Sequence, residues 1–278
     1  MKKSIILFIV SFILLNTALA QSLTDVWKSE SVFATPESVF YDASRNQIYV
    51  SNINGQPVEK DGNGFISLLA DDGSIKELKW VEAGLNAPKG MAVYKNNLYV
   101  TDIDRVAIID IKKGELVKFI DVPGAQFLND MVSDGSGKIY ITDMYKNQLL
   151  VLENEKVNSW IEIDELSNPN GLAMENGKLL VGCSNYLLSF DPKTKEFNFL
   201  VNETGGIDGL VPIGNGKYVI SDWAGKIQLV SSNEPAIVLQ NTTDEKIQAA
   251  DLGYIPAQQL IIIPTFFNNR LIAKKLND

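Results

Sequence analysis

The chain repeats one short pattern six times. Each copy begins with a polar residue, continues through an apolar stretch and a polar turn, and ends with a second apolar stretch closed by a small or acidic residue. Examples are NDMVSDGSGKIYITD at residues 129–143 and DGLVPIGNGKYVISD at residues 208–222. Successive copies are 38 to 52 residues apart, and their lead polar residues are Glu37, Lys89, Asn129, Asn170, Asp208 and Asp251. Internal repeats of 20 to 50 residues are typical of solenoids, propellers and arrays.

Each repeat predicts about four antiparallel strands. Short runs rich in Val, Ile, Leu and Tyr alternate with turns of Gly, Asn, Asp and Pro, and no stretch after residue 20 keeps a helical period. A unit of about forty residues with four strands is a propeller blade. We therefore predict an all-β fold, a six-bladed β-propeller with four antiparallel strands per blade.

The two ends of the repeat region predict how the ring closes. The last repeat supplies only three strands, at residues 252–255, 260–264 and 270–276. Residues 26–33, ahead of the first repeat, would provide the fourth. An N-terminal strand that closes the last blade would cover sheet edges that otherwise invite aggregation.

The first twenty residues have the pattern of a secretory signal. Lys2 and Lys3 precede an apolar stretch, and Ala18-Leu19-Ala20 is a typical cleavage site. We predict a signal peptide over residues 1–20 and one propeller domain over residues 21–278. The mature protein would be periplasmic or secreted, with no stable membrane insertion after cleavage. Its single cysteine, Cys183, excludes an internal disulfide.

Composition removes several classes of function. The net charge of −9 argues against nucleic acid as a partner, because phosphate binding needs a basic surface. The chain has no histidine, which excludes Ser-His-Asp catalysis and histidine zinc sites. Any catalysis must use carboxylates, Lys, Tyr or a metal with oxygen ligands. We expect a small-molecule substrate and a monomer.

The lead residues are the candidate metal ligands. The first strand of each propeller blade lines the central channel, so these side chains should meet at one end of it. Crowded carboxylates and amides would favour a cation, and Ca²⁺ takes six to eight oxygen ligands; Mg²⁺ or Mn²⁺ would also suit them. Lys89 cannot ligate as an ammonium group but could pair with Glu37 or Asp251. The alternative is that the lead residues cap turns and hold water.

Aromatic residues follow the second strand of several repeats and should surround the same end of the channel. Tyr145, Tyr186, Trp223 and Phe266 are the candidates, and with Lys89 and Asp251 they would form a small-molecule pocket. The longest insertion, at residues 52–64, leaves from this end and would overhang the mouth.

These motifs resemble those of the SMP-30/gluconolactonase/LRE-like family. The matching segments are Pro36-Glu37-Ser38-Val39, Phe127-Leu128-Asn129-Asp130, Pro169-Asn170-Gly171-Leu172 and Ile207-Asp208-Gly209-Leu210. The resemblance covers all six repeats and implies a six-bladed hydrolase with one catalytic Ca²⁺. Glu37, Asn129, Asn170 and Asp208 would hold the metal, and Asp208 or Asp130 would act as general base or attacking carboxylate.

The resemblance implies a calcium-dependent hydrolase of lactones or related esters. Phe127 stands where sugar lactonases usually carry an arginine, which favours a less polar substrate. The alternative is a non-catalytic extracytoplasmic propeller that binds a small ligand or a protein. A third hypothesis is a strictosidine-synthase-like enzyme, which would use a channel glutamate without calcium.

Overall fold

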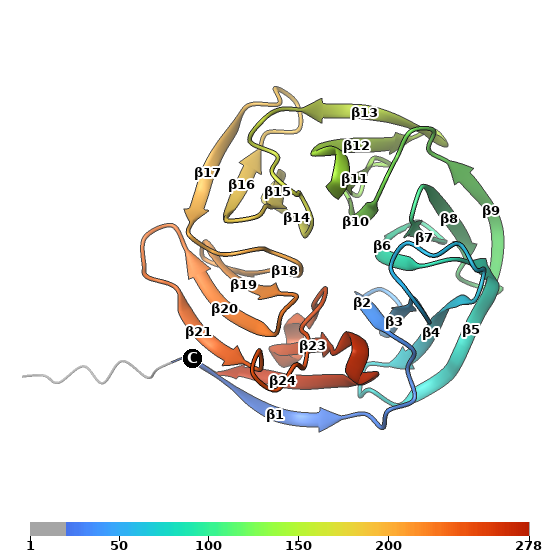
Figure 1. Ribbon diagram of the computed structural model, residues 1–278, viewed down its shortest axis with the longest axis horizontal. Coiled ribbons are helices and arrows are strands. Elements are labelled where there is room, and N and C mark those ends of the chain that lie inside the picture. Colours follow the sequence, from blue (N-terminus) through green and yellow to red (C-terminus); the bar gives the residue numbers. More distant parts are fainter. Residues whose placement is uncertain (1–20, 278) are drawn as a thin grey trace, which may run out of the picture.

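The sheets of the computed structural model surround one central axis, and each is antiparallel with four strands (Figure 1). The structure describes residues 21–277, so the predicted signal peptide at residues 1–20 lies outside the described part. The described part contains 3-10 helices but no α-helix, and no helix in it is long and apolar enough to cross a membrane. The predicted six-bladed propeller is confirmed.

Each of the first three blades is built from consecutive strands. The first holds β2 (Pro36–Asp42), β3 (Gln47–Asn52), β4 (Gly64–Ala70) and β5 (Ile75–Leu85). The second holds β6 (Pro88–Tyr94), β7 (Asn97–Asp102), β8 (Arg105–Asp110) and β9 (Glu115–Asp121). The third holds β10 (Leu128–Ser133), β11 (Ile139–Asp143), β12 (Gln148–Glu153) and β13 (Lys156–Glu162), with the 3-10 helix η1 (Met144–Lys146) after β11.

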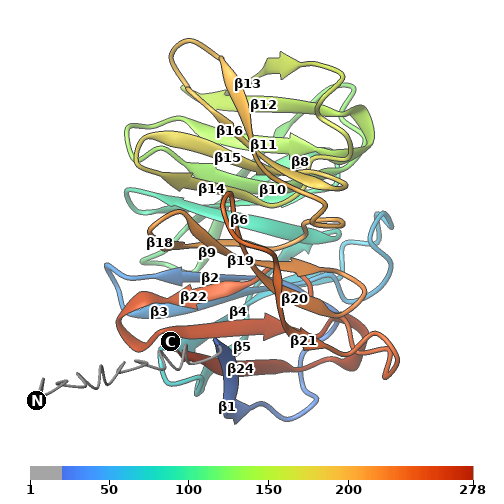
Figure 2. The ribbon, with the colours of Figure 1, turned by 90° about the vertical axis from the view of Figure 1, so that its left-hand side faces the viewer.

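The remaining blades continue the ring, which Figure 2 shows from the side. The fourth holds β14 (Leu172–Glu175), β15 (Lys178–Gly182), β16 (Tyr186–Phe190) and β17 (Phe197–Asn202). The fifth holds β18 (Leu210–Gly214), β19 (Lys217–Asp222), β20 (Lys226–Ser231) and β21 (Ile237–Asn241). The last combines β22 (Gly253–Ile255), β23 (Leu260–Pro264) and β24 (Leu271–Asn277) with the N-terminal β1 (Ser22–Lys28), and contains η2 (Pro256–Gln258) and η3 (Phe266–Asn268).

The ring closes through the pairing of β1 with β24, which lie side by side in Figure 1. Ser22 stands opposite Asn277 and Lys28 opposite Ile272, so an N-terminal strand does complete the last blade. The strand occupies residues 22–28, whereas 26–33 was predicted. Phe33 lies beyond the strand and is buried instead in the core between the first and last blades.

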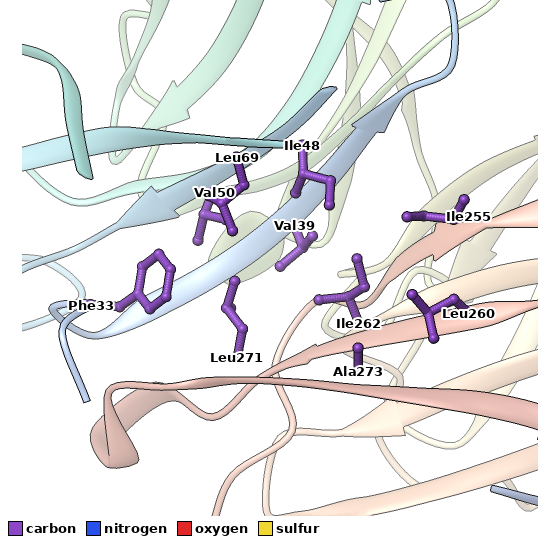
Figure 3. Packing of buried hydrophobic residues seen from close by; sticks show 10 residues of the cluster. All are labelled: Phe33, Val39, Ile48, Val50, Leu69, Ile255, Leu260, Ile262, Leu271 and Ala273. Atoms are coloured by element: carbon purple, nitrogen blue, oxygen red, sulfur yellow. The ribbon is translucent and has the colours of Figure 1, made fainter. Parts of the chain in front are cut away.

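Apolar side chains fill the space between neighbouring blades. Between the first and last blades, Phe33, Val39, Ile48, Val50 and Leu69 face Ile255, Leu260, Ile262, Leu271 and Ala273 (Figure 3). Similar clusters join other neighbouring pairs of blades. Burying a side chain of the size of Val, Leu or Ile contributes about 1.5–3 kcal/mol, so these interfaces carry much of the ring's stability.

Glycines let the blades approach closely near the channel. A Cβ added to Gly90 would lie 2.5 Å from the Cα of Asp130, and one added to Gly209 would lie 2.5 Å from the backbone nitrogen of Leu252. Real Cβ atoms do not approach the backbone so closely. Any larger residue at these two positions would therefore displace the neighbouring blade.

Candidate functional site

A cavity of about 310 Å³ opens at the end of the channel where the first strands begin. Its polar walls are five of the six predicted lead residues: Glu37, Lys89, Asn129, Asn170 and Asp208. Its apolar walls come mainly from loops after the second strands: Ile53, Pro57, Phe127, Met144, Tyr145, Trp223 and Phe266. The structure thus brings the four candidate metal ligands into one mouth cavity.

Buried hydroxyl groups near the ends of the second strands hold the lead residues in place. The Thr142 hydroxyl accepts a hydrogen bond from the backbone N–H of Asp130 in its own blade (2.9 Å) and reaches the carbonyl of Asn170 in the next (3.2 Å). Thr101 and Ser221 make the corresponding contacts with the carbonyls of Asn129 and Ala250. In the sequence, second strands end in the pairs Ser-Asn, Thr-Asp or Ser-Asp. The recurring hydroxyl residue in these pairs could have predicted the contacts between blades, but our sequence analysis did not identify it.

Asp251 lies outside the mouth cavity, because the last repeat is shifted by one residue. Ala250 takes the lead position there: its N–H donates to the carbonyl of Pro264 (3.1 Å), as the N–H of Asp208 donates to Ser221 (2.8 Å). Asp251 follows it, and its carboxylate accepts a hydrogen bond from the Ser38 hydroxyl at 2.5 Å.

Asp130 and Asp251 line a different cavity of about 300 Å³, formed by later parts of the first strands such as Phe40 and Val132. The carboxylate of Asp130 accepts hydrogen bonds from the N–H groups of Met131 (2.6 Å) and Leu172 (2.5 Å). Burial raises the pKa of Asp130 to about 7, although these bonds oppose the shift. Of the two candidate bases, Asp208 alone lines the mouth cavity.

Two carboxylate oxygens in the mouth cavity are buried without a hydrogen-bond donor: Oε2 of Glu37 and Oδ2 of Asp208. Burial raises the pKa of Glu37 well above its usual range, and the charge of Asp208 adds to this while Lys89 opposes it. Burial also raises the pKa of Asp208 to about 7, opposed by the hydrogen bond from Asn170 Nδ2 to Oδ1 (2.7 Å). Both carboxylates are placed where a cation would stabilise their charged forms.

Lys89 is almost fully buried, with 1% of its surface exposed. Its ammonium group donates to the carbonyls of Pro57 (2.8 Å) and Ala87 (2.9 Å) and lies 4.7 Å from the centre of the Phe127 ring. Burial lowers its pKa to about 8, opposed by the nearby charges of Glu37 and Asp102. Lys89 lines the mouth but makes no direct ion pair with a described carboxylate; it fastens the insertion at residues 52–64 over the cavity.

Three of the four predicted aromatic residues line the mouth. Tyr145 stacks on Phe127 with ring centres 4.5 Å apart, and Trp223 meets Phe266 edge-to-face at 5.4 Å. Tyr186 does not reach the cavity: its hydroxyl donates to the carbonyl of Glu165 (2.8 Å) and its ring packs on Phe199. The aromatic wall therefore has a gap at the fourth blade.

Cys183 is buried at this gap, and burial raises the pKa of its thiol to about 12. The thiol stays protonated at neutral pH, so it lacks the thiolate form that acts as a nucleophile.

No protein-family model matches the chain, and no curated protein sequence matches it. Several solved structures are similar to this chain. A presumed gluconolactonase superimposes with a TM-score of 0.66 at 16% identity, covering 93% of each chain. A streptogramin B lyase gives 0.65 at 14% identity, covering 92% of this chain and 97% of the other. A catalytically inactive virginiamycin B lyase from Staphylococcus aureus, solved with quinupristin, gives 0.62 at 15% identity, covering 92% of this chain and 100% of the other. At these identities the likeness establishes a shared propeller fold.

Proposed function

We propose that this protein is a divalent-metal-dependent hydrolase of lactones or related esters, with Ca²⁺ as the metal. The observation that carries the proposal is the pair of carboxylate oxygens, Glu37 Oε2 and Asp208 Oδ2, buried in one cavity without donors. Buried charges are normally paired or bound to metal, and a cation between these groups would remove the charge imbalance.

The chemistry of the donor set fits a hard cation. The described residues hold no cluster of three or more His, Cys, Asp or Glu side chains placed for a metal. The two carboxylates would therefore need the amide oxygens of Asn129 and Asn170, which line the same cavity. Carboxylate and amide oxygens suit Ca²⁺, and Mg²⁺ or Mn²⁺ would use the same ligands.

The chain's own residues supply the rest of the reaction. Asp208 would take a proton from water as the water oxygen bonds to the ester carbonyl carbon, and would return it to the departing alkoxide as the carbon–oxygen bond breaks. Phe127 and Phe266, which are both buried, would form an apolar wall beside the reacting group. When bound, Ca²⁺ would polarise the substrate carbonyl as a Lewis acid.

Two observations favour lactones and esters as the substrate class. The four motif segments resemble those of lactone hydrolases, and a presumed gluconolactonase shares the fold. The mouth has Phe127 and no arginine, which favours a neutral substrate with apolar surface. A lyase shares the same fold, so the architecture alone does not select the reaction.

The first test is thermal unfolding in EGTA and then in excess Ca²⁺, for wild type and Glu37→Gln. At a free Ca²⁺ concentration of one hundred times Kd, binding adds about 2.7 kcal/mol to the free energy of unfolding. This should raise Tm by at least a few degrees in wild type and not in Glu37→Gln. No shift in wild type would reject the metal site and favour a non-catalytic propeller that binds a small ligand or a protein.

The second test is turnover of a panel of lactones and aryl esters by wild type and Asp208→Asn. We expect a loss of at least about a hundredfold in kcat in the variant, because the general base is removed. The conservative control is Asp244→Asn, at an exposed aspartate that does not line the cavity, and this variant should keep most of the activity. An Asp208→Asn enzyme with wild-type kcat would contradict the assignment.

A further inference from the structure

A second cavity adjoins the mouth cavity and shares part of its wall. It has a volume of about 320 Å³ and lies over the junction of the fourth and fifth blades. The two cavities share Met144, Asn170, Asp208 and Trp223. Since Asp208 borders both, a molecule reacting at this residue can extend into either one. We call the second cavity the side groove.

The side groove exists because the fourth blade lacks the large residue that other blades place beside the mouth. Tyr145, Trp223 and Phe266 follow the second strands of the third, fifth and last blades, and all three line the mouth. In the fourth blade Cys183 and Ser184 follow β15, and Tyr186 turns away from the mouth. Opposite them, Gly206 contributes no side chain to the groove.

Both cavities have mostly apolar walls, but the side groove has the larger polar share. The mouth cavity is walled by aromatic rings, with Tyr145 stacked on Phe127 and Phe266 packed against Trp223. The side groove adds the polar side chains of Asn168, Ser184 and Asp222. Asp222 accepts the N–H of Ala224 at Oδ1 (2.9 Å), while no donor among the described residues binds its Oδ2. A partly exposed carboxylate oxygen of this kind is an acceptor for a ligand hydroxyl.

We propose that the mouth cavity and the side groove form one bipartite binding cleft. Its substrate class is an ester or lactone that carries an apolar, aromatic-sized part on one side of the scissile bond and a hydroxylated part on the other. The apolar part binds among the aromatic residues of the mouth, and the hydroxylated part lies in the side groove near Asp222. The scissile bond lies between them, beside Asp208. The position of the scissile bond rests on the proposed function, whereas the division of the cleft rests on the two cavities.

Gly206 offers a way to fill the groove without disturbing the fold. A Cβ at this position meets no atom within 4 Å, and its φ lies outside the positive range that disfavours side chains. Gly206→Phe should therefore place a ring in the groove at little backbone strain. Gly206→Ala is the matched control, because it adds the Cβ and leaves the groove open.

The test measures binding of two stable ethers by ligand-observed NMR in Ca²⁺ buffer. 3-(Benzyloxy)propane-1,2-diol carries both an aromatic and a dihydroxylated part, and benzyl methyl ether carries the aromatic part alone. Wild type and Gly206→Ala should bind the diol about three- to tenfold more tightly than the methyl ether, as one or two net hydrogen bonds allow. Gly206→Phe should abolish this preference and leave methyl ether affinity unchanged.

Equal affinity of wild type for the two ethers, or a preference that survives in Gly206→Phe, would overturn the bipartite cleft. Because neither ether can be hydrolysed, this result is independent of catalysis. Hydrolysis is measured separately, with 2,3-dihydroxypropyl phenylacetate against ethyl phenylacetate. Diol-dependent binding without turnover of any ester would uphold the cleft and reject the hydrolase. Turnover without diol-dependent binding would uphold the hydrolase and reject the cleft.

Discussion

At the scale of single residues, the buried hydroxyl groups connect stability to the site. Thr142 contacts the first strand of its own blade and the lead residue of the next, and it is fully buried. One side chain therefore fixes the spacing between two blades at the channel and the backbone position of Asn170. The geometry of the candidate metal ligands depends on hydroxyls that never face the cavity.

Thr142→Val should destabilise the protein by about 1–3 kcal/mol, because the isosteric side chain leaves buried backbone groups without their partner. Guanidinium unfolding monitored by fluorescence would measure the change. Thr194→Val, at an exposed hydroxyl, is the control and should stay within about 0.5 kcal/mol of wild type. Equal stability of both variants would show that the hydroxyl contacts contribute little.

The repeat predicted five of the six lead residues correctly as neighbours and misplaced the sixth. Glu37, Lys89, Asn129, Asn170 and Asp208 were found because polar residues stood in the same register before each apolar run. Asp251 was misplaced because Ala250 holds the lead position, and alanine differs from the polar lead residues of the other repeats. The polar residue one position later was therefore aligned with them instead. Neighbouring residues of a strand face opposite sides, so a shift of one residue changes the cavity that a side chain lines.

At the scale of elements, a buried lysine fastens the middle of the insertion at residues 52–64 over the mouth, while hydrogen bonds of Ile53, Asn54 and Gly62 hold its ends. Lys89 donates to the carbonyl of Pro57, and this bond fastens the insertion to the wall of the cavity. Lys60 adds an ion pair with Asp104, but both side chains are substantially exposed. Exposed ion pairs contribute little, so the buried contact should dominate.

Lys89→Met should free the insertion and speed cleavage after Glu59 by endoproteinase Glu-C several-fold, because the Pro57 carbonyl loses its donor. Lys60→Met is the matched control and should be cleaved at close to the wild-type rate. Mass spectrometry of the first fragments would locate the cut. Slow cleavage at Glu59 in both variants would show that other contacts hold the insertion.

The elements themselves were predictable to different degrees. Alternating apolar patterns and turn residues placed the inner strands well, because these strands lie in cores shared by neighbouring blades. The closing strand was misplaced toward Phe33, since β1 is largely exposed and its apolar pattern is weak. The gap in the aromatic wall was also unpredictable, because the orientation of Tyr186 depends on a tertiary contact with the Glu165 carbonyl.

At the scale of the whole molecule, the ring depends on a pairing between the two ends of the chain. β1 covers the edge of β24, and Trp27 and Leu23 pack against the cores on either side of the last blade. Without this strand the last sheet would have three strands and an unprotected edge. Stability is thus a property of the closed ring rather than of separate blades.

In a protein made of residues 21–278, deletion of residues 21–28 should lower Tm by several degrees and promote aggregation, because the β24 edge and the adjoining cores become exposed. Scanning calorimetry and light scattering would measure both effects. A synthetic peptide of residues 21–31, added in excess, should restore much of the lost stability, and a scrambled peptide should not. A truncated protein as stable and soluble as the protein of residues 21–278 would contradict this role of β1.

The pairing of Ser22 with Asn277 also means that the described chain ends beside the point where it began. A circular permutant could therefore join these ends with a short linker and open the chain at the exposed Gly124, between β9 and β10. Every blade would then consist of contiguous residues. Ring closure would rely on the packing and the few hydrogen bonds between the second and third blades, such as that of Leu128 with the Ile103 carbonyl (2.8 Å), and no blade would be completed by the other end of the chain. The difference in stability between the two forms would measure how much closure by strand pairing adds to closure by packing.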